Sequence, residues 1–160
     1  MNMRKVFADE IHKQMKDNKN IWVLVGDMGY KMWDKVRDDY PDRWINTGAA
    51  ETALVDIAIG LAISGKLPFV YTATPFLIYR PFESLRNYLD HENIPVRLVG
   101  GSRDRDYKNE GFSHWSEGTR HTLGIFMNIT QYWPNTEDQI QEIVSEMLLN
   151  SEPSFISLRR

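Results

Sequence analysis

Glu51 occupies a position from which a carboxyl group could do chemistry. It follows Gly48 and opens a stretch that is small or apolar from Ala49 to Ser64. Two interpretations fit such a carboxyl. It can be a first-turn acid that stabilises the helix dipole by less than about 1 kcal/mol, or an acid in apolar surroundings that exchanges a proton with a bound ring. Asp56, a second acid in the same stretch, is expected to make a polar contact between helices.

Other residues that can bind or transfer charge are spread along the chain. Asp27 follows an apolar run closed by Gly26, and His114 lies in a polar segment. Arg4 and Arg160 stand near the two ends. The plainer interpretations are a strand-end turn for Asp27, a structural histidine and two solvated arginines. Which interpretation holds for each residue therefore depends on where the fold places it.

Short apolar runs alternate with helical periods along the chain. Strands are predicted at 21–25, 44–47, 68–72, 95–99 and 155–158, and helices at 3–17, 49–64, near 80–89, at 115–124 and after the capping sequence 135–139. Continuous apolar strands are typical of parallel sheets covered on both faces. We therefore predict an α/β fold, a three-layer sandwich with a mainly parallel central sheet and helices on both faces, formed by residues 1–160 as a single domain.

Ligands of such sheets bind at the carboxyl ends of the strands. The loops that follow the predicted strands also hold most of the unusual residues. They are 26–30, 47–51, 72–80, 100–114 and 159–160.

Composition narrows the classes of protein. The chain has 160 residues, a net charge of −3 and no cysteine, which excludes a disulfide scaffold, a thiol nucleophile and a cysteine-based metal site. The charge offers no general attraction for nucleic acid. No apolar run approaches the roughly 20 residues that span a bilayer. We expect a cytoplasmic protein with no nucleic-acid or membrane partner.

A longer motif surrounds Glu51. It reads PDRWINTGAAE at 41–51 and IAIGLA at 57–62, and it ends at Gly65. Further stretches are PFVY at 68–71, PFL at 75–77 with Arg80, LRN at 85–87, GFSH at 111–114 and PNT at 134–136. In this order and spacing they resemble the pyrimidine-binding domain of the transketolase family, over nearly the whole chain.

The resemblance implies a role for each residue on the cofactor side. Glu51 would bond the ring nitrogen N1′ of thiamine diphosphate, so that the 4′ nitrogen can take the proton from the thiazolium C2 carbon. Phe76 would pack on the pyrimidine ring, Tyr79 would be a further aromatic nearby, and Asp27 would close over the cofactor. Core packing is the alternative for the two aromatics.

On the substrate side, the resemblance implies that His114 faces the hydroxyls of the donor sugar, and that Arg4 and Arg160 bind a sugar phosphate. Departures from the family pattern are Thr52 after the glutamate, Ala73 where an aromatic is common, the charged segment 102–110 and Trp115 after His114. A ketose phosphate is the family default, but the charged segment could serve a modified or nucleotide-linked sugar.

A diphosphate-binding motif is expected on another chain. The sequence GDMG at 26–29 lacks the downstream asparagine of the family's magnesium motif, so no metal ligand is assigned here. We predict the small subunit of a split transketolase-like enzyme, inactive alone, which transfers a two-carbon ketol unit between sugars or sugar phosphates. A larger subunit would hold the diphosphate and Mg²⁺ or Ca²⁺ in an α2β2 heterotetramer.

Two alternatives stay open. The first is a subunit of another thiamine diphosphate enzyme, similar to deoxyxylulose phosphate synthase or to a keto acid dehydrogenase or decarboxylase. The second is a non-catalytic flavodoxin-like binding module with Asp27 as a phospho-acceptor. That module would need a lysine after a later strand, where Gly100 and Gly101 stand.

Overall fold

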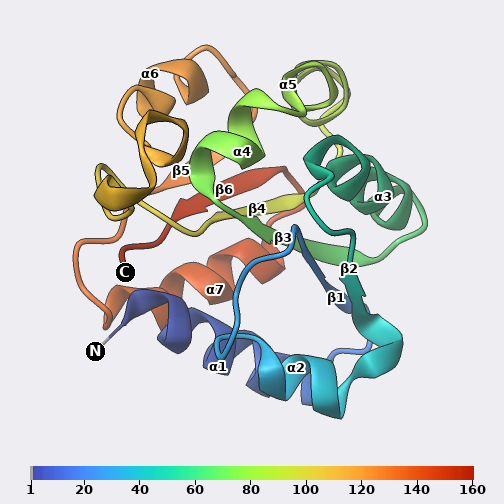
Figure 1. The fold of residues 1–160 in the computed structure, drawn as a ribbon. Coiled ribbons are helices and arrows are strands. Elements are labelled where there is room, and N and C mark those ends of the chain that lie inside the picture. Colours follow the sequence, from blue (N-terminus) through green and yellow to red (C-terminus); the bar gives the residue numbers. More distant parts are fainter. Residues whose placement is uncertain (1) are drawn as a thin grey trace.

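The computed structural model describes residues 2–160 and contains a sheet of six strands (Figure 1). The strands are β1 (Ile21–Val25), β2 (Trp44–Asn46), β3 (Leu67–Thr72), β4 (Arg97–Gly100), β5 (Thr130–Tyr132) and β6 (Ser154–Ser157). Their order is β2-β1-β3-β4-β6-β5, and every neighbouring pair is parallel. The predicted α/β class with a parallel central sheet is confirmed.

Helices cover both faces of this sheet. They are α1 (Met3–Asp17), α2 (Asp34–Asp39), α3 (Glu51–Ile63), α4 (Thr74–Tyr79), α5 (Phe82–Ser84), α6 (Thr119–Leu123) and α7 (Gln139–Leu149), with the 3₁₀-helices η1 (Pro41–Arg43), η3 (Lys108–Glu110) and η4 (Phe112–His114) and the π-helix η2 (Leu85–His91). In Figure 1, α1, α2 and α7 lie on one side of the sheet and α3 to α6 on the other.

Strand residues alternate between two cores, as the pleat of a strand requires. Val23 and Val25 belong to the core shared with α1 and α7, whereas Leu24 belongs to the core shared with α3 and η2. Both faces of β1 are therefore buried, which explains why its sequence is continuously apolar.

The helix that begins at Glu51 ends as predicted. Gly65 adopts φ of +79°, a left-handed conformation that glycine reaches without strain. Its N–H donates to the Ala62 carbonyl at 3.0 Å, and the Lys66 N–H donates to the Leu61 carbonyl at 2.9 Å, which satisfies free carbonyls at the helix end.

The polar contact expected of Asp56 is also confirmed. The Ser84 hydroxyl donates to Asp56 Oδ1 at 2.6 Å and so joins α3 to α5.

The helix predicted near 80–89 is found as α5 and η2, over residues 82–91, whereas the predicted loop 72–80 contains the helix α4. Helical structure begins at Thr74, stops before Pro81 and resumes as α5 and η2. Pro81 has no N–H and its ring collides with the preceding turn, so a helix breaks there. Pro75 is tolerated because it lies in the first turn of α4.

Two other helices differ from the prediction. α2 was not predicted, because its residues are mostly charged and Val36 is its buried residue. α6 begins at Thr119 instead of residue 115, because Gly118 adopts φ of +83° just before it. Within residues 2–160, none of the helices combines the length and the apolar character needed to cross a membrane.

Candidate active site

The carboxyl ends of the parallel strands meet at one edge of the sheet, where such sheets bind ligands. Asp27 lies in the turn after β1, Glu51 after β2, α4 after β3, and the segment 101–118 after β4. The final residues of the chain leave β6 at the same edge. The fold thus places the loops that follow the predicted strands at one edge of the sheet.

Glu51 is the first residue of α3, and only 3% of its side chain is exposed. Gly48, with φ of +67°, turns the chain between β2 and α3. Asn46 Oδ1 holds this turn by accepting the Gly48 N–H at 2.9 Å and the Asp27 N–H at 3.2 Å. A buried carboxylate at a helix N-terminus is stabilised by the dipole, but it also needs a close charged or hydrogen-bonding partner.

That partner is Arg80. Its Nη1 donates to Glu51 Oε2 at 2.7 Å, and we find no other hydrogen bond to this carboxylate within residues 2–160. The guanidinium carbon also lies 3.7 Å from the centroid of the Phe76 ring. The His114 ring meets Phe76 at 4.8 Å between centroids, with 68° between the planes. We call Glu51, Arg80, Phe76 and His114 the acid–aromatic cluster.

A second group of side chains lies beside this cluster, linked to it by the 6.4 Å contact between the rings of His114 and Tyr107. Arg4 Nη1 donates to the Tyr107 hydroxyl at 2.8 Å, and the Arg160 guanidinium lies 5.5 Å from the same ring. Arg4, Tyr107 and Arg160 line a pocket of about 420 Å³ together with Asp27 and Tyr71. We call it the cationic pocket.

Tyr71 lies in the lining of the cationic pocket with its hydroxyl buried. Its buried hydroxyl has no partner of hydrogen-bonding geometry among the described residues, although the Arg4 guanidinium is near. Burial raises the pKa of Tyr71 to about 12, against the opposing charge of Arg4. The guanidinium groups of Arg4 and Arg160 in the lining suit the pocket to an anionic ligand.

Charged side chains of the segment 102–110 contact other residues of the fold. Arg103 is buried and donates to the Ser157 hydroxyl at 3.1 Å and to the Pro134 carbonyl at 2.7 Å. Arg159 pairs with Asp104 at 2.9 Å, and further along Arg105 pairs with Glu117 at 2.7 Å. Arg103 therefore fixes the start of the loop that presents Tyr107 and His114, whereas the two exposed pairs contribute little to holding it.

The structure brings most of the predicted residues together. Glu51, Phe76 and His114 share the acid–aromatic cluster, whereas Arg4, Arg160 and Asp27 line the cationic pocket. Asp27 is exposed and has φ of +52°.

Tyr79 lies apart from both groups. Its hydroxyl is 3.5 Å from Thr122 Oγ1 on α6, and 47% of the residue is exposed.

Sequence reasoning assigned no role to Arg80, Tyr71 or Tyr107. Arg80 ends one of the selected loops, but nothing in its neighbours points to Glu51 as a partner. Tyr107 is the aromatic residue in the charged segment 102–110, and this was the available signal for it.

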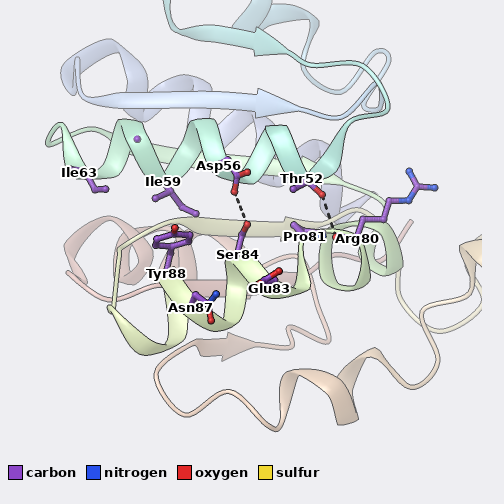
Figure 2. A pocket seen from close by; sticks show the side chains of 11 residues that line it. Thr52, Asp56, Ile59, Ile63, Arg80, Pro81, Glu83, Ser84, Asn87 and Tyr88 are labelled. Atoms are coloured by element: carbon purple, nitrogen blue, oxygen red, sulfur yellow. Dashed lines mark hydrogen bonds between the residues drawn. The ribbon is translucent and has the colours of Figure 1, made fainter.

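A groove of about 650 Å³ runs from the acid–aromatic cluster between α3 and η2 (Figure 2). Ile59 and Ile63 face Tyr88 across it, and the Asp56–Ser84 hydrogen bond closes its middle. Ile63 is 70% exposed and Ile57, on the same helix, is 40% exposed. A helix that is apolar on all sides is typical of a buried position, yet one side of α3 is uncovered in this chain.

The comparison with protein families removes one of the two open alternatives. The family described as "Transketolase, pyrimidine binding domain" matches residues 1–160. The chain belongs to this family. A flavodoxin-like regulator is therefore set aside.

Relatives of this transketolase-type chain include transketolase subunits. It is 31% identical to an apulose-4-phosphate transketolase subunit of Actinobacillus succinogenes over 120 residues, which is 75% of this chain and 39% of the relative. It is 24% identical to a 6-deoxy-6-sulfo-D-fructose transketolase subunit of a Clostridium species over 159 residues, 99% of this chain and 49% of the relative. The chain thus spans half or less of the length of these relatives.

Among solved structures, one described as "Split gene transketolase, inactive beta4 tetramer" superposes with a TM-score of 0.87 and 25% sequence identity. It is covered over 51% of its length by the whole of this chain. A transketolase from Leishmania mexicana superposes with a TM-score of 0.87 at 17% identity, over 99% of this chain and 25% of that one, which supports the fold alone.

Thiamine diphosphate is the cofactor that the family implies, and the residues present fit its aminopyrimidine ring. A buried carboxylate can accept from a ring N–H, and Phe76 beside it offers an aromatic surface. Metal ligands are a separate question. In the described part of the chain, no three His, Asp or Glu side chains are grouped to hold a metal ion.

Proposed function

We propose that this chain is the small subunit of a split transketolase-like enzyme that transfers a two-carbon ketol unit between sugar substrates. The observation that carries the proposal is the carboxylate of Glu51, 3% exposed at the start of α3 and adjacent to Phe76 at the carboxyl edge of the sheet. A buried acid beside an aromatic surface is what a proton exchange with a flat, nitrogen-containing ring requires.

In this proposal, Glu51 bonds the pyrimidine ring and holds or moves its proton, while Phe76 packs on the ring. Bound thiamine diphosphate supplies the nucleophilic carbon that carries the two-carbon unit. Asp27 lies in the wall of the neighbouring pocket and would close the site on the cofactor. Tyr79, whose hydroxyl faces α6, would contact the cofactor only from the edge of the site.

The substrate would lie along the line from His114 to the cationic pocket. His114 contacts Phe76 and Tyr107 and so stands between the two groups, where its ring can bond a sugar hydroxyl. Arg4 and Arg160 would bind a phosphate or another anionic end of the sugar, because neither guanidinium pairs with a carboxylate within residues 2–160.

A larger subunit would complete the site. It would contribute the diphosphate pocket and Mg²⁺ or Ca²⁺ and would cover the exposed apolar side of α3, in an α2β2 assembly. Exposed Ile57 and Ile63 support such a contact, since apolar groups of this size are normally buried. The small subunit alone would not turn over.

Reconstitution tests this function. The chain is co-expressed with a candidate larger subunit that carries the family's magnesium motif, and transfer from a ketose phosphate to an aldose phosphate is followed with thiamine diphosphate and Mg²⁺. We expect turnover by the complex and none by either chain alone. A complex that binds the cofactor but transfers no ketol unit from any sugar would contradict the proposed reaction, and turnover by the small chain alone would contradict the proposed assembly.

A further inference from the structure

Arg80 makes two contacts at once inside the acid–aromatic cluster. It donates to the buried carboxylate of Glu51 at 2.7 Å, and its guanidinium lies over the Phe76 ring at 3.7 Å. These are the two surfaces that the proposed function assigns to the cofactor's pyrimidine ring.

A guanidinium group and an aminopyrimidine ring have related chemistry. Both are planar, both carry N–H donors in the plane, and a guanidinium stacks on aromatic faces while it donates to a carboxylate. From this juxtaposition we propose that Arg80 occupies the seat of the cofactor's ring in the cofactor-free subunit and leaves it when the ring binds. The inference rests on the proposed function of Glu51 and Phe76.

The burial of the two partners shows which of them can move. The side chain of Glu51 is 3% exposed, whereas that of Arg80 is 45% exposed. The backbone of Arg80 is fixed, because its N–H donates to the Phe76 carbonyl at 3.3 Å, its carbonyl accepts from Thr52 Oγ1 at 3.4 Å, and Pro81 follows. The long side chain must therefore do the moving, and in Figure 2 it points away from the groove, beyond Thr52.

The Arg80 contact also has a reason to exist before the ring arrives. A buried carboxylate without a partner is strongly unfavourable, and we find no second hydrogen bond to Glu51 within residues 2–160. Arg80 thus compensates the charge of the acid in the free subunit.

A permanent partner would behave differently from a temporary one. If Arg80 stayed on Glu51 in the loaded enzyme, its removal would weaken cofactor binding, because the loaded state would lose the same contact. If Arg80 must leave, its removal strengthens binding, because the ring no longer has to displace it. Whether the affinity for the cofactor rises or falls when Arg80 is removed therefore distinguishes a temporary partner from a permanent one.

The experiment measures the dissociation constant of thiamine diphosphate, with Mg²⁺ in excess, by calorimetry on the complex with the larger subunit. Wild type is compared with Arg80→Ala and Arg80→Lys. The matched control is Arg105→Ala, because Arg105 also donates to a glutamate at 2.7 Å and lies over an aromatic ring at 4.4 Å, but with the exposed Glu117 as partner. We expect Arg80→Ala to bind about tenfold tighter, Arg80→Lys to be intermediate and the control to be unchanged.

A second measurement needs no variant. The side-chain N–H signals of Arg80 in the NMR spectrum of the wild-type complex should be protected from exchange without cofactor and should lose that protection when thiamine diphosphate is added. Equal or weaker binding by Arg80→Ala, or Arg80 signals that ignore the cofactor, would overturn the inference and leave the proposed function standing. A wild-type complex that binds no thiamine diphosphate would overturn the proposed function, and this inference with it.

Discussion

Two arginine–glutamate pairs in this molecule have similar contacts and different surroundings. In each, an arginine nitrogen lies 2.7 Å from a glutamate oxygen and the guanidinium lies over an aromatic ring, Phe76 for Arg80 and Trp115 for Arg105. The glutamate side chains are 3% exposed in the first pair and 50% exposed in the second.

Burial is what gives the first pair its chemistry. An exposed pair gains little, because water and salt screen both charges. A carboxylate taken out of water depends on its partner, and its bond to that partner can be exchanged for a bond to a ligand. Glu117 keeps its contact with water whatever lies beside it, whereas the buried carboxylate of Glu51 depends on the group that binds it.

The largest expected effect is a loss of activity on substitution of Glu51 but not of Glu117. In the assembled complex, Glu51→Gln should lower kcat by about 10²- to 10⁴-fold, the usual contribution of a positioned acid or base. The control Glu117→Gln should stay within about twofold, as expected of an exposed pair. Steady-state kinetics together with gel filtration, which reports assembly, check both. Wild-type rates from Glu51→Gln would remove that residue from the mechanism.

A third arginine extends the comparison, since Arg4 donates to the neutral hydroxyl of Tyr107 and keeps its charge available. Arg4→Gln should raise KM for a phosphorylated sugar by about 10- to 100-fold while kcat changes little. The control Lys35→Gln removes a cation that already pairs with Asp9 at 2.9 Å. An equal rise in KM for an unphosphorylated sugar would show that Arg4 does not bind the anionic end.

Stability of the isolated chain gives the next contrast. A double-mutant cycle with Glu51→Gln and Arg80→Ala should show a coupling of about 1–3 kcal/mol in urea unfolding. The cycle with Glu117→Gln and Arg105→Ala should give less than about 1 kcal/mol and should vanish in concentrated salt. Equal couplings would mean that burial does not distinguish the pairs.

The sequence predicted the parts of this site that depend on local pattern. The apolar strand before Asp27 and the glycine-ended helix after Glu51 are visible in the order of residues, because buried parallel strands and helix ends have their own signatures. The parallel order then brings the predicted loops to one edge. Asp56, expected to bridge helices, does so through Ser84.

The contacts between loops could not be predicted in the same way. The pair of Glu51 and Arg80 joins residues 29 positions apart, and Arg80 caps the helix α4, which lies in a segment predicted to be a loop. The charges of segment 102–110 also gave no sign of which partners they have within the fold. Its Arg103 is buried on main-chain and hydroxyl oxygens, because a loop of this length needs internal partners for its polar groups.

The smallest expected effect returns to an exposed carboxylate, now with pH as the variable. Asp9 accepts from Lys5 at 2.8 Å and from Lys35 at 2.9 Å. Partial burial alone would raise the pKa of Asp9, but the hydrogen bonds and charges of the two lysines outweigh it and hold the pKa below its usual 3.8. A carboxyl with a lowered pKa in the folded state stabilises the fold at neutral pH, and this contribution disappears as the pH falls through the folded-state value. Asp9→Asn should therefore cost less than about 1 kcal/mol near neutral pH, and its unfolding free energy should converge on that of wild type in acid. A difference that persists or grows below the folded-state pKa would assign the effect of Asp9 to packing on α1 and not to its charge.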